Sequence, residues 1–162
     1  TTRNADLFKQ ISYHHRVYGY TVSPFSAMLV GRGLESLKVR LAAHAVNASK
    51  LIEALKSHSR LAKMYYVDPD KVKAFSGSNG LFSVELNRFY SDAELEKLFL
   101  RLATFKIGES WGGTRSLVLP FQPDEFNTRF VRPKNTIVRF HSGLEDIELQ
   151  LADVKAFVNA LD

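Results

Sequence analysis

An arginine lies inside a strand-like apolar run near the C-terminal end of the sequence. Arg139 stands between Val138 and Phe140, residue types that favour a half-buried pleated surface. A guanidinium stays charged at any working pH, so burying it without an anionic partner costs free energy. The run therefore predicts a carboxylate partner for Arg139, supplied either by the protein or by a ligand. The structural alternatives are an internal ion pair with Glu85 or Glu109, or an edge-strand arginine that reaches solvent.

The sequence Ser110-Trp111-Gly112-Gly113, called here the 110–113 segment, carries further groups that suit a carboxylate ligand. The Ser110 hydroxyl and the backbone N–H groups can donate hydrogen bonds, and the two glycines allow close backbone approach. Trp111 supplies a flat apolar wall. We predict a substrate-binding site made of Arg139, Ser110 and Trp111. The alternative for this segment is a Gly-Gly turn beside a core tryptophan.

The same stretch matches G-x-S-x-G, the motif that presents a serine nucleophile in many hydrolases. Asp124 and His141 follow Ser110 in the chain order of a catalytic triad. The motif requires a helix directly after the serine, whereas residues 114–119 have a strand-like composition and Pro120 follows them. We therefore reject a serine hydrolase.

Other classes of site are excluded by composition and spacing. None of the five histidines has a metal-site spacing such as H-E-x-x-H, so we expect structural or surface roles, with His141 able to support the arginine site. The chain has no cysteine, which excludes disulfides and Cys-type zinc sites. Its net charge of +5 is dispersed, which argues against a nucleic-acid partner. No apolar run reaches the length of a membrane span, and we expect a cytoplasmic protein.

The helical signals lie mainly in the first third of the chain. A chain of 162 residues suits one domain with a substantial core. Asn4 can cap a first helix that Gly19 ends, and Ser23-Pro24 opens a long helical region that we expect to bend or break near Gly31 and Gly33. Capping boxes are predicted at Ser91 with Glu94 and at Ser142 with Glu145, the second opening the last helix.

The strand signals follow these helices. They cover residues 61–67, 81–86, 103–107, 116–119 and 136–140, and the fourth is expected to end at Pro120. Long helices followed by strands with only two further helices predict an α+β fold with a mostly antiparallel sheet and helices on one face.

Three stretches together resemble the C-terminal small domain of the Cys/Met-metabolism family of pyridoxal-phosphate (PLP) enzymes. Trp111, which lies in one of these stretches, stands where γ-lyase and γ-synthase relatives usually carry leucine, and this favours the β-lyase branch. The likeness covers nearly the whole chain. The stretches are Thr21-Val22-Ser23-Pro24 through Arg32-Gly33-Leu34-Glu35-Ser36-Leu37 to Arg40, His44 and Asn47; the 110–113 segment with Ser116-Leu117; and Ile137-Val138-Arg139-Phe140-His141 with Gly143-Leu144-Glu145-Asp146.

The resemblance implies the small domain of a fold type I (aspartate aminotransferase-like) enzyme, with residues 1–22 ending the PLP-binding large domain and residues 23–162 forming the small domain. It implies α,β-elimination of L-cystathionine to homocysteine, pyruvate and ammonia in methionine biosynthesis, by a homotetramer. Arg139 would bind the substrate α-carboxylate, helped by Ser110 and the backbone near Trp111. The alternatives are a γ-lyase, γ-synthase or methionine γ-lyase of the same family, or a non-catalytic ligand-binding or oligomerisation module.

The family's PLP-binding and catalytic residues would all precede Thr1, in the remainder of the same polypeptide. None of the eleven lysines here lies in the family's Schiff-base motif, so we expect the isolated chain to be inactive and to contain no catalytic or cofactor-binding residue. The sequence departs from the family between Tyr66 and Gly80, where a longer loop is usual, and at Gly31, where a bulkier residue is common.

Overall fold

The computed structural model describes residues 2–72, 74–125 and 132–161. The chain divides into two compact units, Thr1–Leu37 and Lys38–Asp162. The first unit contains helices α1 (Ala5–Tyr18) and α2 (Pro24–Glu35), neither of which buries a side chain.

Both helices of the first unit begin where the capping signals predict. The Asn4 side chain accepts hydrogen bonds from the N–H groups of Asp6 and Leu7, and Gly19 ends α1 with a left-handed φ of 66°. Ser23 caps α2 in the same way, with proline in the first turn. The helical region breaks slightly later than the bend or break expected near Gly31 and Gly33, because both glycines lie inside α2 and that helix ends at Glu35.

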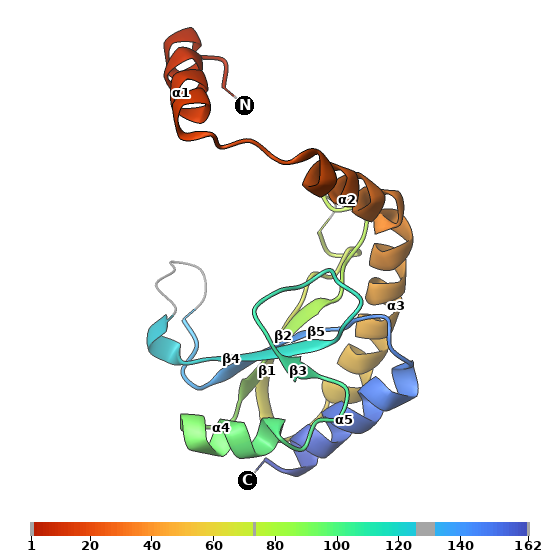
Figure 1. Ribbon diagram of the computed structural model, residues 1–162. Helices are drawn as coiled ribbons and strands as arrows, with labels where there is room; N and C mark the ends of the chain where they lie inside the picture. Colours follow the sequence, from red (N-terminus) through yellow and green to blue (C-terminus); the bar gives the residue numbers. More distant parts are fainter. Residues whose placement is uncertain (1, 73, 126–131, 162) are drawn as a thin grey trace. The chain divides into compact units, whose positions relative to one another are not determined.

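The second unit is built on a five-stranded sheet (Figure 1). Its order is β1-β2-β5-β4-β3, and all neighbours are antiparallel except β3 and β4. The fold class predicted from the sequence is thereby confirmed. The strands are β1 (Leu61–Tyr65), β2 (Leu81–Leu86), β3 (Lys106–Ile107), β4 (Leu117–Phe121) and β5 (Ile137–His141).

Helices α3 (Leu37–Leu55), α4 (Asp92–Phe99) and α5 (Ile147–Asn159) contribute apolar side chains to one core with the sheet. Phe140 of β5 lies at its centre and is fully buried, with ring centroids of Phe82, Phe105 and Phe157 within 5.3–5.6 Å. Glu94 accepts hydrogen bonds from the N–H and hydroxyl of Ser91, which confirms the predicted capping box of α4. A short 3-10 helix, η1 (Pro123–Glu125), follows β4.

Two strand predictions are corrected by long-range contacts. Residues 103–105 do not join β3, because their backbone N–H groups all donate to the buried carboxylate of Asp153 on α5. β4 continues through Pro120 instead of ending there. β3 pairs only with Leu117 and Val118, so the missing N–H of Pro120 lies on an unpaired edge where no partner needs it.

The second predicted capping box is wrong. Asp146 caps α5 and accepts a hydrogen bond from the N–H of Glu148. Glu145 turns away to bind Ser116, and the Ser142 hydroxyl donates to the side chain of Gln150.

Within the described ranges, no helix combines the length and apolar character needed to cross a bilayer.

Candidate functional site

Arg139 lies at the middle of β5, the central strand of the sheet. It is registered opposite Ser83 of β2 and Leu119 of β4. Its neighbours Val138 and Phe140 are both fully buried in the helix-packed core, so strand alternation directs Arg139 to the opposite face. Arg139 itself is half-buried. Its guanidinium therefore remains accessible to a ligand.

The partners of Arg139 are not carboxylates. Its Nη2 donates a hydrogen bond to the backbone carbonyl of Glu109, and the guanidinium carbon lies 5.6 Å from the ring centroid of Phe121. Among the described residues Arg139 makes no ion pair. Glu85 accepts hydrogen bonds from the Tyr65 hydroxyl and from backbone N–H groups instead. The internal pairs with Glu85 and with the Glu109 carboxylate are thus absent.

The hydrogen bonds around Glu85 explain why it is not available to the arginine. Burial acts to raise the pKa of Glu85, but the hydrogen bonds from Tyr65 and from the N–H groups of Lys134 and Asn135 outweigh it and lower the pKa. Burial, together with the same hydrogen bond, raises the pKa of Tyr65 to about 12. This carboxylate is already satisfied by local donors.

The structure brings the 110–113 segment and Arg139 together. Arg139 holds the carbonyl of Glu109, and His141, two residues further along β5, accepts a hydrogen bond from the N–H of Gly112 at 3.1 Å. Residues two apart on a strand point to the same face, so one strand face anchors both ends of this short stretch. Gly112 has a φ of 77°, a left-handed conformation that favours glycine.

Ser110 and Trp111 lie between these two anchors and are exposed. The Ser110 hydroxyl makes no hydrogen bond with another described residue. Trp111 is 57% exposed, so the alternative of a core tryptophan is wrong. Its side chain borders a cavity of about 320 Å³ that is also lined by Leu41, Phe75 and Ser78.

The hydrolase motif has no structural support. The required helix does not follow Ser110, because β4 is the next regular element along the chain. The ring of His141 is hydrogen-bonded to the backbone of Gly112 rather than to the Ser110 hydroxyl. The arrangement supplies hydrogen-bond donors for an anion and no activated nucleophile.

His141 and His44 form a buried pair that the sequence did not reveal. Their rings meet edge to face with centroids 5.0 Å apart, and their exposed fractions are 2% and 0%. Both ring nitrogens of His44 and the Nδ1 of His141 have no hydrogen-bond partner among the described residues. Burial is the main cause that lowers the pKa of both rings, while the Gly113 backbone and Glu145 act in the opposite direction.

A second polar network is centred on the carboxylate of Glu145. The Glu145 carboxylate accepts hydrogen bonds from the N–H and hydroxyl of Ser116, and that hydroxyl accepts the N–H of Gly143. Asn47 of α3 donates to the carbonyl of Gly143. The network joins α3, the start of β4 and the turn after β5. No sequence pattern pointed to Glu145 as its centre, because its partners lie far away in the chain.

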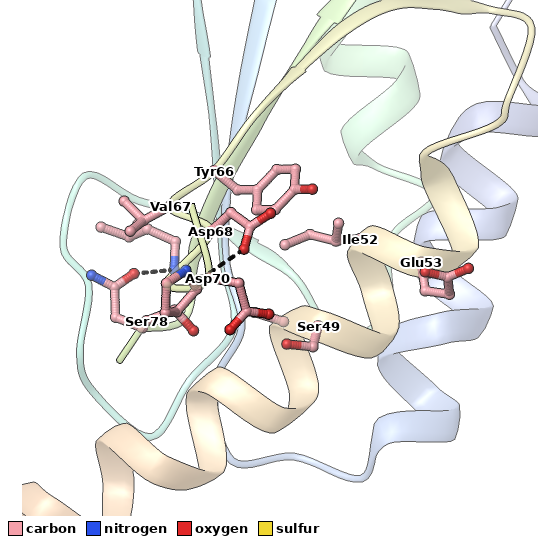
Figure 2. A pocket seen from close by; sticks show the side chains of 12 residues that line it. Ser49, Ile52, Glu53, Tyr66, Val67, Asp68, Asp70 and Ser78 are labelled. Carbon is pink, nitrogen blue, oxygen red and sulfur yellow. Dashed lines mark hydrogen bonds between the residues drawn. The ribbon is translucent and has the colours of Figure 1, made fainter. Parts of the chain in front are cut away.

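A further cavity of about 280 Å³ lies between α3 and the segment that follows β1. Figure 2 shows Ser49 and Ile52 on the helix opposite Tyr66 and Asp68 from that segment. Asp68 is paired with Lys71, and the hydrogen bond from the Lys71 ammonium lowers the pKa of Asp68. Within the described residues, no three His, Asp or Glu side chains are grouped as metal ligands.

The donor set around Arg139 fits a carboxylate. It offers a guanidinium, and the exposed serine hydroxyl of Ser110 follows directly after Glu109, whose carbonyl Arg139 holds. It does not fit PLP, because that cofactor needs a lysine amine and none of the residues that build this site is a lysine. The guanidinium and the hydroxyl can donate hydrogen bonds to a carboxylate.

Known proteins resemble the chain over nearly its whole length. Residues 1–159 match the family described as Cys/Met metabolism PLP-dependent enzyme. The chain is 31% identical to cystathionine β-lyase MetC of Escherichia coli, an alignment that covers 94% of this chain and 42% of that protein. It is also 31% identical to an L-alanine/L-glutamate racemase of Wolbachia pipientis, with 93% and 40% covered. The chain thus spans less than half the length of these relatives.

Solved structures show the same fold. The MetB structure from Corynebacterium glutamicum superimposes with a TM-score of 0.77 at 27% identity, covering 100% of this chain and 44% of that one. The cystathionine γ-synthase of Xanthomonas oryzae, solved with cystathionine, gives a TM-score of 0.75 at 26% identity, covering 99% and 44%. Sequence and fold agree, and the chain belongs to the Cys/Met metabolism family of PLP-dependent enzymes.

Proposed function

We propose that this chain is the C-terminal part of a PLP-dependent carbon–sulfur lyase that acts on L-cystathionine by α,β-elimination. The products would be homocysteine, pyruvate and ammonia, as in methionine biosynthesis. Residues 1–22 would end the large domain and residues 23–162 would form the small domain. The likeness to β-lyases and the tryptophan at position 111 support this reaction over the γ-eliminations of other family members.

The observation that carries the proposal is the accessible guanidinium of Arg139 beside the 110–113 segment. Arg139 makes no ion pair with a described residue, and the Ser110 hydroxyl next to its Glu109 anchor has no described partner. A bidentate arginine–carboxylate pair fixes both the distance and the angle of an amino acid. In this role Arg139 holds the substrate α-carboxylate, Ser110 donates to it, and Trp111 lines the pocket wall.

The cofactor and the residues of this chain would have separate roles. Carbanion stabilisation is chemistry that PLP supplies when bound, and the region upstream of this chain would hold it. The residues described here bind and orient the substrate so that the bond to be broken is aligned. Assembly as a homotetramer belongs to the same proposal and rests on the family alone.

Replacement of Arg139 in the full-length enzyme tests the proposal. A charged hydrogen-bonded pair is worth about 1.5–3 kcal/mol, so Arg139→Ala should lower kcat/KM for cystathionine about 10- to 100-fold. Arg139→Lys should recover only part of this loss, because an ammonium cannot form the bidentate pair. Arg101→Ala, which removes an exposed arginine two residues after the end of α4, is the matched control. An unimpaired Arg139→Ala enzyme would remove this residue from the site.

Product analysis separates the proposed reaction from its rivals within the family. β-Elimination of cystathionine yields pyruvate, whereas γ-elimination yields 2-oxobutyrate. Chromatographic detection of 2-oxobutyrate as the main keto acid would assign the enzyme to the γ-lyase branch. If the enzyme does not turn over cystathionine at all, the same carboxylate site would serve a different amino-acid substrate.

A further inference from the structure

The contact between His141 and Gly112 requires an unprotonated ring nitrogen. Nε2 of His141 lies 3.1 Å from the backbone nitrogen of Gly112. A backbone N–H can only donate, so Nε2 must accept, and the proton of the neutral ring then lies on Nδ1. The carbonyl of Gly113 is 3.4 Å from the same Nε2 and would require the other tautomer. The shorter contact favours the tautomer with the free lone pair on Nε2, in which the Nδ1–H has no hydrogen-bond partner among the described residues.

The surroundings of His141 favour this neutral form. The ring is 2% exposed and lies edge to face against the fully buried ring of His44. The backbone also closes around it, since a Cβ atom on Gly80 would lie 2.9 Å from its Nδ1. The charged groups that face the pair are Arg40, Arg139 and Glu145.

Burial is the largest influence on the titration of both rings. It lowers the pKa of His141 and of His44 from the usual 6.5, and each arginine lowers the pKa of its neighbouring ring further. Glu145 and the Gly113 backbone oppose this shift without cancelling it. Both imidazoles are therefore neutral at pH 7 and above.

We propose that His141 is a positioning residue, which in its neutral form holds Gly112 and so fixes the 110–113 segment beside Arg139, and whose protonation breaks its hydrogen bond with Gly112. The inference rests on the proposed function, because it gives the segment a role in binding the substrate carboxylate. A protonated Nε2 would present an N–H to the N–H of Gly112, and two donors cannot bond. That N–H would face the Gly113 carbonyl 3.4 Å away instead, and Arg139 would still hold the carbonyl of Glu109, so protonation changes only the contact at Gly112.

Hydrogen exchange tests this directly, without any substrate. In the full-length enzyme, peptides that cover residues 108–116 should show the Gly112 amide exchanging about fivefold faster in His141→Leu, the factor that one net hydrogen bond is worth. His141→Gln keeps an acceptor of similar reach and should restore protection. His58→Gln, on a histidine remote from the segment in sequence and in its contacts, should leave it unchanged.

Acid pH supplies a second comparison, which does not depend on how well the leucine variant folds. After correction for intrinsic rates, the unmodified protein should lose protection of Gly112 only as the pH falls below 6.5, because burial lowers the pKa of His141, whereas His141→Gln should keep its protection. Constant protection in the unmodified protein overturns the proposal. Equal loss of protection in the leucine and glutamine variants at pH 7.5 also overturns it, because ring packing and not the acceptor would then hold the segment.

Steady-state kinetics connects the segment to substrate binding. Because the loosened groups bind the substrate throughout the reaction, His141→Leu should raise KM for cystathionine several-fold with a smaller change in kcat. In His141→Gln, kcat/KM should fall less steeply at acid pH than it does in the unmodified enzyme. An effect on kcat alone contradicts the positioning role. If the exchange pattern is as expected but the unmodified enzyme does not cleave cystathionine, the proposed reaction fails and the role of His141 in holding the segment stands.

Discussion

Replacement of Asp153 by alanine should destabilise the second unit strongly. The Asp153 carboxylate is 5% exposed and accepts three backbone hydrogen bonds, from Ala103 at 3.0 Å, Thr104 at 2.7 Å and Phe105 at 2.9 Å. It thereby ties α5 to the chain that enters β3. Alanine would leave three N–H groups without this acceptor next to the core residue Phe105.

The magnitude follows from the number of bonds and from what offsets them. Hydrogen bonds to a charged group are worth about 1.5–3 kcal/mol each, so three independent bonds would give about 5–9 kcal/mol. Alanine also removes the cost of burying a carboxylate, and the 103–105 backbone can relax toward water, so the sum overstates the effect. We expect Asp153→Ala to lower the free energy of unfolding by about 3 kcal/mol. Asp153→Asn keeps one oxygen acceptor and should lose about half as much.

Urea denaturation followed by circular dichroism measures this difference, because a change in midpoint at constant slope reports stability. Lys155→Ala is the matched control, since Lys155 lies two residues further along the same helix and is exposed. A loss below about 1 kcal/mol for Asp153→Ala, comparable to a surface substitution, would refute the view that this carboxylate organises residues 103–105.

Two further predictions concern the turn after β5 and the buried histidines. A Cβ on Gly143 would lie 2.5 Å from the carbonyl carbon of Arg115 and 2.6 Å from the nitrogen of Ser116. Gly143→Ala should therefore lower the free energy of unfolding, measured in urea, by at least about 2 kcal/mol. Gly77→Ala, which has open space around its Cβ position, should lower it much less. Because the pKa of His44 and of His141 is lowered on folding, the unfolded chain binds more protons below pH 6.5 and stability should fall as the pH drops from 7.5 to 5.5. Urea titrations of a His44→Phe, His141→Gln double variant should show a weaker pH dependence, and an unchanged dependence would contradict the assignment to these rings.

The sequence predicted best those features that depend on neighbouring residues. Asn4, Ser23 and the Ser91–Glu94 capping box mark helix starts because a cap is satisfied within three residues. The strand around Arg139 was also evident, because its β-branched and aromatic residues favour a pleated surface. The fold class and the family followed from the order of these elements and from motifs spread along the chain.

Two of the errors share one physical cause, which is competition by partners remote in sequence. Glu145 stood at the right spacing to cap α5 from Ser142, but Ser116 offered it two donors, and Asp146 took over the cap. Residues 103–105 had strand-like composition, but Asp153 of α5 captured their N–H groups. A local pattern cannot report which distant donor or acceptor the folded chain brings within reach.

The sequence by itself determined the element types, the antiparallel α+β architecture and the choice of Arg139, Ser110 and Trp111 as the candidate carboxylate site. Only the tertiary structure decided that Arg139 is half-buried and makes no ion pair with a described residue, and that His44 and His141 meet in the interior. Helix caps and strand alternation are set by residues within a few positions of one another. The meeting of α3 with the end of β5 depends on packing nearly one hundred residues apart, which burial of the common core stabilises.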